Sequence, residues 1–174
     1  MSEGNGWSFT ALGTPAPQGS KKGFILKGAG GRDRVIITDA NRKTKPWRQA
    51  VIEGIPEGYP KLVGAVAVYM ALTMPRPKAA RKSDRTPSTR PDVSKLARAV
   101  EDSITDAGLW GDDGQITEYM RLAKVWTDYD PAALEVPGVL VAAIEMTDDD
   151  WADGLIDLVR DALAKHRQQK EATA

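Results

Sequence analysis

The sequence predicts a single α+β domain: a small mixed β-sheet with flanking helices, plus a C-terminal amphipathic helix. Three observations predict it. The chain has 174 residues, a length that one domain with its own core accommodates. Its composition, 41% hydrophobic and 28% charged, is ordinary for a globular protein. Segments with strand-like apolar patterns also alternate along the chain with segments of helical periodicity.

The strand predictions follow from alternation, turn residues and long apolar runs. Residues 7–12 alternate between apolar and polar side chains, as a half-buried strand does. Residues 23–27 and 34–38 flank the glycine-rich segment 28–31, which predicts a hairpin. Residues 62–74 form the longest apolar stretch and are expected to form a buried central strand. Two further strands are expected at residues 116–126 and 139–146.

Three helices are expected at residues 45–55, 93–106 and 150–166. In the first, Trp47, Val51 and Ile55 recur at every fourth position. The second ends before Gly108, a residue that favours helix termination. The third carries its apolar residues on one side, and the polar tail from residue 167 is expected to fray.

Composition excludes several kinds of site. Cysteine is absent, which excludes disulfides, thiolate zinc sites and a cysteine nucleophile. The single histidine, His166, excludes a histidine-rich metal site within one chain. No apolar run reaches the roughly 18 residues that a membrane span requires, and the polar N-terminus is unlike a secretory signal. We therefore expect a cytoplasmic protein that has no membrane partner.

Charge is divided between the two halves of the chain. Residues 1–98 contain 18 Lys or Arg and 7 Asp or Glu, a net charge of +11, whereas residues 99–174 contain 6 and 17, a net charge of −11. This asymmetry indicates a polyanionic partner for the basic half. The alternative is a solvated surface on which the two halves neutralise each other.

Acidic residues flank the helix expected at 93–106. Asp92 stands at its start, directly after the basic, proline-rich segment 75–91, and Asp112 and Asp113 follow its end. Taken separately, Asp92 is typical of a helix cap and Asp-Asp-Gly of a turn. Together, carboxylates beside a basic loop suit Mg²⁺ and a phosphodiester, because Mg²⁺ prefers oxygen ligands and cations hold the phosphates. Arg98, on the same helix, could stabilise charge on that phosphate.

These residues form a recognisable pattern between Arg90 and Ile116. The pattern has an aspartate opening a helix, a cation on that helix, an aspartate near its end, and then Gly-x-Trp-x-Asp-Asp-x-Gln. It resembles the core of RusA-type Holliday junction resolvases, with a phage-like character in the N-terminal segment. The resemblance covers residues 62–146 well. We therefore divide the chain into a RusA-like nuclease domain, residues 1–146, and a helical extension, residues 147–174.

The resemblance implies roles for individual residues. Asp92 and Asp113 match the catalytic, metal-binding aspartates, with Asp112 as an additional metal ligand and Arg98 as the catalytic cation. Ser94 stands where the family has a second aspartate. Either Asp112 supplies the missing oxygen, or the protein is a weak or inactive nuclease. The residues expected to bind DNA are basic and are listed here: Lys21, Lys22, Arg76, Lys78, Arg81, Lys82, Arg85, Arg90 and Lys95.

The expected function is that of a homodimeric, Mg²⁺-dependent endonuclease, with Mn²⁺ as an alternative metal. It would resolve four-way DNA junctions by paired symmetric phosphodiester cuts. The substrate follows from the resemblance, whereas composition and spacing indicate only a polyanion and a metal. One alternative is a non-catalytic protein of the same fold that binds branched DNA and is impaired at Ser94. Another is a structural protein whose acidic helix docks a partner.

Overall fold

The computed structural model describes residues 5–19, 21–28, 34–39, 41–127, 129–147 and 150–172. Within these residues the chain forms two sheets and three α-helices, which confirms the α+β class. The strands are β1 (Gly6–Leu12), β2 (Lys21–Leu26), β3 (Arg34–Asp39), β4 (Val66–Thr73), β5 (Ile116–Val125) and β6 (Gly138–Glu145). The helices are α1 (Thr44–Glu53), α2 (Val93–Asp106) and α3 (Trp151–Glu171), with a short 3-10 turn, η1, at Asp113–Gln115.

The main sheet is mixed, in the order β1-β6-β4-β5. β6 pairs antiparallel with both β1 and β4, whereas β4 and β5 run parallel. Because β6 and β4 are interior strands, nearly all of their residues are buried. The expected central strand is therefore confirmed, although it begins at Val66. Leu62, four residues earlier, is buried but donates its backbone N–H to Leu109 O at 2.8 Å.

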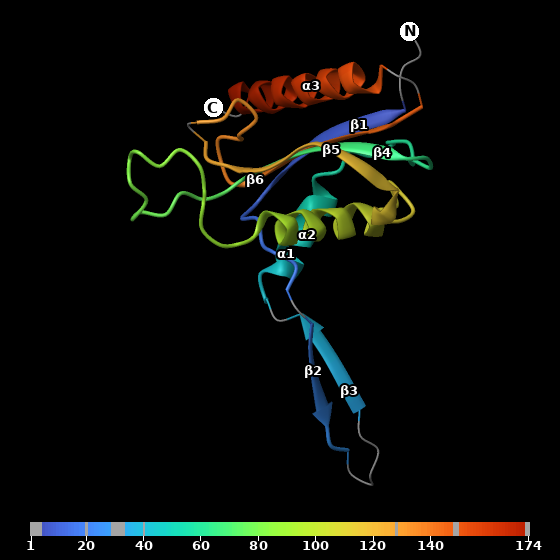
Figure 1. Cartoon of the computed structure of the whole chain (residues 1–174), viewed down its shortest axis with the longest axis vertical. Helices are drawn as coiled ribbons and strands as arrows, with labels where there is room; N and C mark the ends of the chain where they lie inside the picture. Colours follow the sequence, from blue (N-terminus) through green and yellow to red (C-terminus); the bar gives the residue numbers. More distant parts are fainter. Residues whose placement is uncertain are drawn as a thin grey trace.

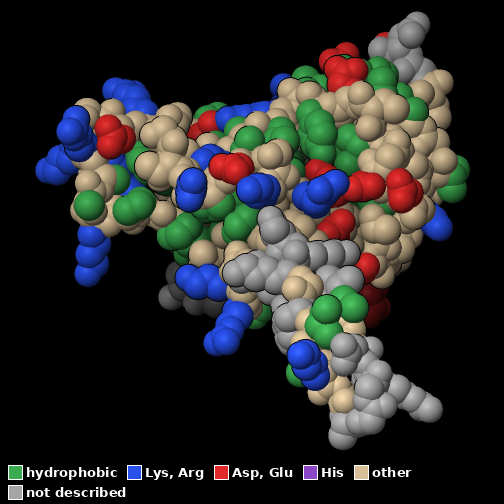
Figure 2. All heavy atoms as spheres, turned by 60° about the horizontal axis from the view of Figure 1, so that its bottom comes forward, with side chains coloured by type: hydrophobic (Ala, Val, Ile, Leu, Met, Phe, Trp, Pro, Cys, Tyr) green, Lys and Arg blue, Asp and Glu red, His purple; other side chains and the backbone are tan. Residues whose placement is uncertain are grey.

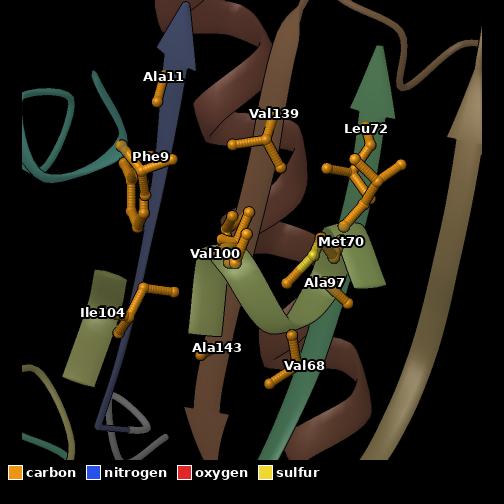
Figure 3. Close-up of a cluster of buried hydrophobic side chains, with 14 of the residues drawn as sticks. Phe9, Ala11, Val68, Met70, Leu72, Ala97, Val100, Ile104, Val139 and Ala143 are labelled. Carbon is orange, nitrogen blue, oxygen red and sulfur yellow. The ribbon is translucent and has the colours of Figure 1, made fainter. Parts of the chain in front are cut away.

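Helices cover both faces of this sheet (Figure 1). α1 and α2 lie on one face and α3 on the other. In Figure 3, Ala97, Val100 and Ile104 of α2 point into apolar side chains that come from all three of β1, β4 and β6. α2 has the expected bounds and ends two residues before Gly108, whose φ of +78° is a conformation that glycine adopts readily. This packing fixes α2 rigidly against the sheet.

α3 forms the second layer of the core. Leu155, Val159 and Ala162 are buried against β1 and β6. The helix continues to Glu171, so the expectation that the chain frays from residue 167 was wrong for residues 167–171. The polar residues there include Arg, Gln and Lys, which are good helix formers and extend an existing helix at little cost.

The hairpin of β2 and β3 stands apart from the main sheet. The two strands pair antiparallel, with Ile25 opposite Val35, as the sequence predicts. Figure 1 shows them projecting away from the body of the molecule. Both Ile25 and Val35 are exposed. The turn at residues 29–33 lies outside the described residues.

Candidate active site

Asp92 is the residue that precedes α2. Its backbone is extended, with φ −68° and ψ 138°, and its side chain makes no capping hydrogen bond. The carboxylate instead lies 3.3 Å from the Lys95 ammonium, one turn into the helix. Both side chains are more than half exposed. Asp92 therefore presents its carboxylate to the outside rather than to the helix backbone.

Asp112 shapes the turn that follows α2. Its Oδ1 accepts a hydrogen bond from the Gly114 N–H at 2.8 Å. Gln115 completes the turn, since its Oε1 accepts from the backbone N–H groups of Gly111 and Asp112. The Gln115 amide also donates to Leu62 O at 3.2 Å, which ties the turn to the segment before β4. The Asp112 carboxylate also accepts from the Gln115 backbone N–H, which completes a capping box, and Asp112 is exposed.

Asp113 lies beside the second half of α2. Burial raises the pKa of Glu101 and of Asp102, and the nearby Asp113 carboxylate raises both further. The Tyr119 hydroxyl on β5 donates a hydrogen bond to Glu101 Oε1. Burial raises the pKa of Tyr119 as well, so the phenol stays a donor. The sequence reasoning missed Glu101 and Tyr119, which are 18 residues apart and meet only because β5 packs along α2.

Arg48 links this region to α1. Its Nη2 donates to the backbone carbonyl of Asp102 at 3.4 Å, and its Nη1 lies 3.6 Å from the Asp102 carboxylate. Asp106 forms a second ion pair with the same guanidinium. Arg48 on α1 thus pairs with two aspartates in the second half of α2. Arg98 is exposed on α2, and its positive charge lowers the pKa of Asp102, against the larger raising effect of burial.

Asp92 and Asp113 stand at opposite ends of α2. Asp113 neighbours Glu101, which is nine residues after Asp92, and nine residues rise about 14 Å along an α-helix. In the part of the chain that the structure describes, no group of three His, Cys, Asp or Glu could hold a metal ion. The carboxylate oxygens suit a hard divalent cation. Asp92 and the Glu101 that Asp113 neighbours are about two and a half turns apart along α2.

The basic loop, residues 75–91, contains no helix or strand but protrudes beside α2 (Figure 1). Figure 2 shows Lys and Arg side chains gathered on this protruding lobe. Five of its cations are exposed: Lys78, Arg81, Lys82, Arg85 and Arg90. Arg76 is half-buried and contacts Trp126. Lys21 and Lys22 lie on β2, and their side chains are outside the described residues.

Comparisons with known proteins connect this geometry to a family. A family model described as "Endodeoxyribonuclease RusA" matches residues 15–136, more than half of the chain. The match extends from the segment before β2 to the end of the segment before β6. A curated relative, the uncharacterized protein YqaN of Bacillus subtilis (strain 168), is 25% identical over 132 residues, which are 69% of this chain and 87% of that protein. No helix within the described residues is long and apolar enough to cross a membrane.

Proposed function

Because the chain belongs to the RusA endodeoxyribonuclease family, we propose that it resolves four-way DNA junctions by metal-dependent, paired symmetric cuts. Membership of this family supports Holliday junction resolution by an endonuclease. The metal dependence, the pairing of the cuts and the identity of the catalytic residues are our proposal. The separation of Asp92 from Asp113 along α2 is the observation that bears most directly on them.

The metal ligands that we propose are Asp92 and Asp113, with Asp112 as an additional ligand. All three are carboxylates at exposed or half-exposed positions, as Mg²⁺ or Mn²⁺ requires. Held by these residues, such a cation would supply polarisation of the phosphodiester and a more nucleophilic water. Among the chain's own residues, Lys95 holds the Asp92 carboxylate in place. Arg98 is exposed and would stabilise negative charge that develops on the phosphate.

A second copy of the chain would bring the separated carboxylates together. If α2 of one copy lies antiparallel to α2 of another, Asp92 of the first approaches Asp113 of the second, and the reverse pair forms by symmetry. Charge supports this arrangement, since the first half of the exposed helix face carries Lys95 and Arg98 and the second half adjoins Asp113. A homodimer built in this way contains two equivalent sites, one for each of two paired cuts.

Incubation with a synthetic four-way junction tests this function. We expect two symmetric cuts with Mg²⁺ and none with EDTA, and Asp113→Asn should abolish cutting without loss of junction binding. The matched control is Asp153→Asn, an exposed aspartate on α3 at the far face of the sheet. Binding without cleavage under any divalent cation would instead favour a non-catalytic branched-DNA-binding protein impaired at Ser94.

A further inference from the structure

One cation of the basic loop is directed inward rather than toward solvent. The guanidinium carbon of Arg76 lies 4.5 Å from the centre of the Trp126 ring and 5.2 Å from that of Tyr129. These distances are within the range of favourable cation–π contacts. Trp126 is buried, with only 5% of its surface exposed, and it directly follows β5. Arg76 therefore joins the loop to the folded core.

The same guanidinium also holds the tip of the loop. Its Nη2 donates to Arg81 O at 2.8 Å and to Asp84 O at 3.2 Å. These two residues already close a turn, since Asp84 N–H donates to Arg81 O and Asp84 Oδ2 accepts from Arg81 N–H. Arg85 approaches the Tyr129 ring at 5.8 Å, on the same aromatic group that Arg76 contacts. Arg76 thus fixes the backbone that carries the exposed cations of the tip.

A second cation holds the other end of the loop. Lys124 on β5 donates to Thr89 O at 2.7 Å and to Pro91 O at 2.9 Å. Pro91 immediately precedes Asp92, so Lys124 ties the end of the loop to the start of α2. The loop is therefore held at its tip and at its end by cations whose donors are directed at backbone carbonyls of the loop.

We propose that Arg76 is a positioning residue, which holds the basic loop in the conformation that presents Arg81, Lys82 and Arg85 to DNA. This inference rests on the proposed function, because it takes the loop to be a DNA-binding element. It changes the expected role of Arg76, which composition alone places among the phosphate contacts. A guanidinium is needed here, because only a planar group can stack on Trp126 and donate to two carbonyls together.

Limited trypsin digestion of the full chain, without DNA, tests the positioning role directly. Trypsin does not cut before proline, and Pro77 follows Arg76, so substitution of Arg76 leaves the set of cleavage sites unchanged. We expect Arg76→Gln and Arg76→Lys each to accelerate cleavage after Arg81, Lys82 and Arg85 about tenfold, because cleavage follows the population of the open loop. Arg90→Gln, an exposed cation of the same loop that also precedes a proline, is the control; it leaves the set of cleavage sites unchanged and should leave these rates unchanged.

Junction binding and cleavage separate positioning from direct contact. For a positioning residue, Arg76→Lys weakens binding as much as Arg76→Gln does and raises KM while kcat stays within about twofold of the wild type. For a phosphate contact, Arg76→Lys would bind almost normally and Arg76→Gln would lower the salt slope by about one. A lysine variant with wild-type protease resistance and affinity overturns the proposal.

Two further measurements distinguish a local effect on the loop from a loss of overall stability. The urea midpoint of unfolding should change little in both Arg76 variants, since the loop is peripheral to the core; a large shift would mean that the substitution destabilises the whole fold. Tyr129→Phe keeps the ring and removes only the long hydrogen bond from the hydroxyl to Lys82 O at 3.4 Å, so it should leave the loop largely protected, whereas Tyr129→Leu should expose it. If the wild type binds no junction, the proposed function fails, but the protease result still decides whether Arg76 orders the loop.

Discussion

Neutralising the tip of the basic loop should reduce the salt dependence of junction binding by a calculable amount. Arg81, Lys82 and Arg85 are exposed, and their side chains make no ion pair within the described part of the chain. Each phosphate contact contributes about 0.9 to the slope of log K against log salt on duplex arms. Replacing all three by Gln should therefore lower the slope by about 2.7.

Filter binding or anisotropy between 50 and 200 mM salt measures this change. Over that fourfold range a slope difference of about 2.7 means that the wild type loses about 40-fold more affinity than the triple variant does. The control replaces Arg160, Lys165 and Arg167 of α3 by Gln, which removes the same charge from the opposite face of the sheet. Equal slopes for the loop variant and the wild type would refute the assignment of this loop to DNA.

Three other substitutions test separate parts of the site and fold. Asp112→Asn should reduce cleavage almost as much as Asp113→Asn, because asparagine keeps the turn cap but removes a metal ligand; a fully active variant would limit Asp112 to the turn. Ser94→Asp should change cleavage little, and a large gain in a Mg²⁺ titration would show instead that the native site lacks a carboxylate. Glu145→Gln should destabilise the fold at pH 7 by about 2 kcal/mol, measured by urea unfolding. Hydrogen bonds from the Val63 and Gly64 N–H groups lower the pKa of Glu145, so this stability is present above the ordinary glutamate pKa and is lost as pH falls through the lowered value. The difference between Glu145→Gln and wild type should therefore shrink in acid.

The sequence was sufficient to predict elements whose boundaries have local causes. α2 was predicted at its observed bounds because an apolar stripe defines its buried side and Gly108 ends it. The central strand was predicted too long. Leu62 is as apolar as the strand residues, but a backbone hydrogen bond to Leu109 takes it out of the sheet. A run of apolar residues indicates burial, but it does not by itself indicate which of those residues pair in a sheet.

Contacts across the fold could not be predicted in this way. Arg48 reaches Asp102 from another helix, and Tyr119 reaches Glu101 from a strand, with no spacing rule to connect either pair. Counting charges identified the loop as basic. A count cannot distinguish an exposed cation from one that packs against an aromatic ring, as Arg76 does. The proline-rich composition of the loop likewise gives no sign of the hydrogen bonds that Arg76 makes to its tip.

Mixing two inactive variants tests the central claim, that each active site combines Asp92 of one copy with Asp113 of the other. A dimer of one Asp92→Asn chain and one Asp113→Asn chain would then contain one site with both aspartates and one with neither. We predict that junction nicking, absent from either variant alone, reappears on co-refolding, with single cuts in place of paired ones. Continued inactivity of the mixture, with heterodimers demonstrated by differently tagged chains, would contradict the shared site.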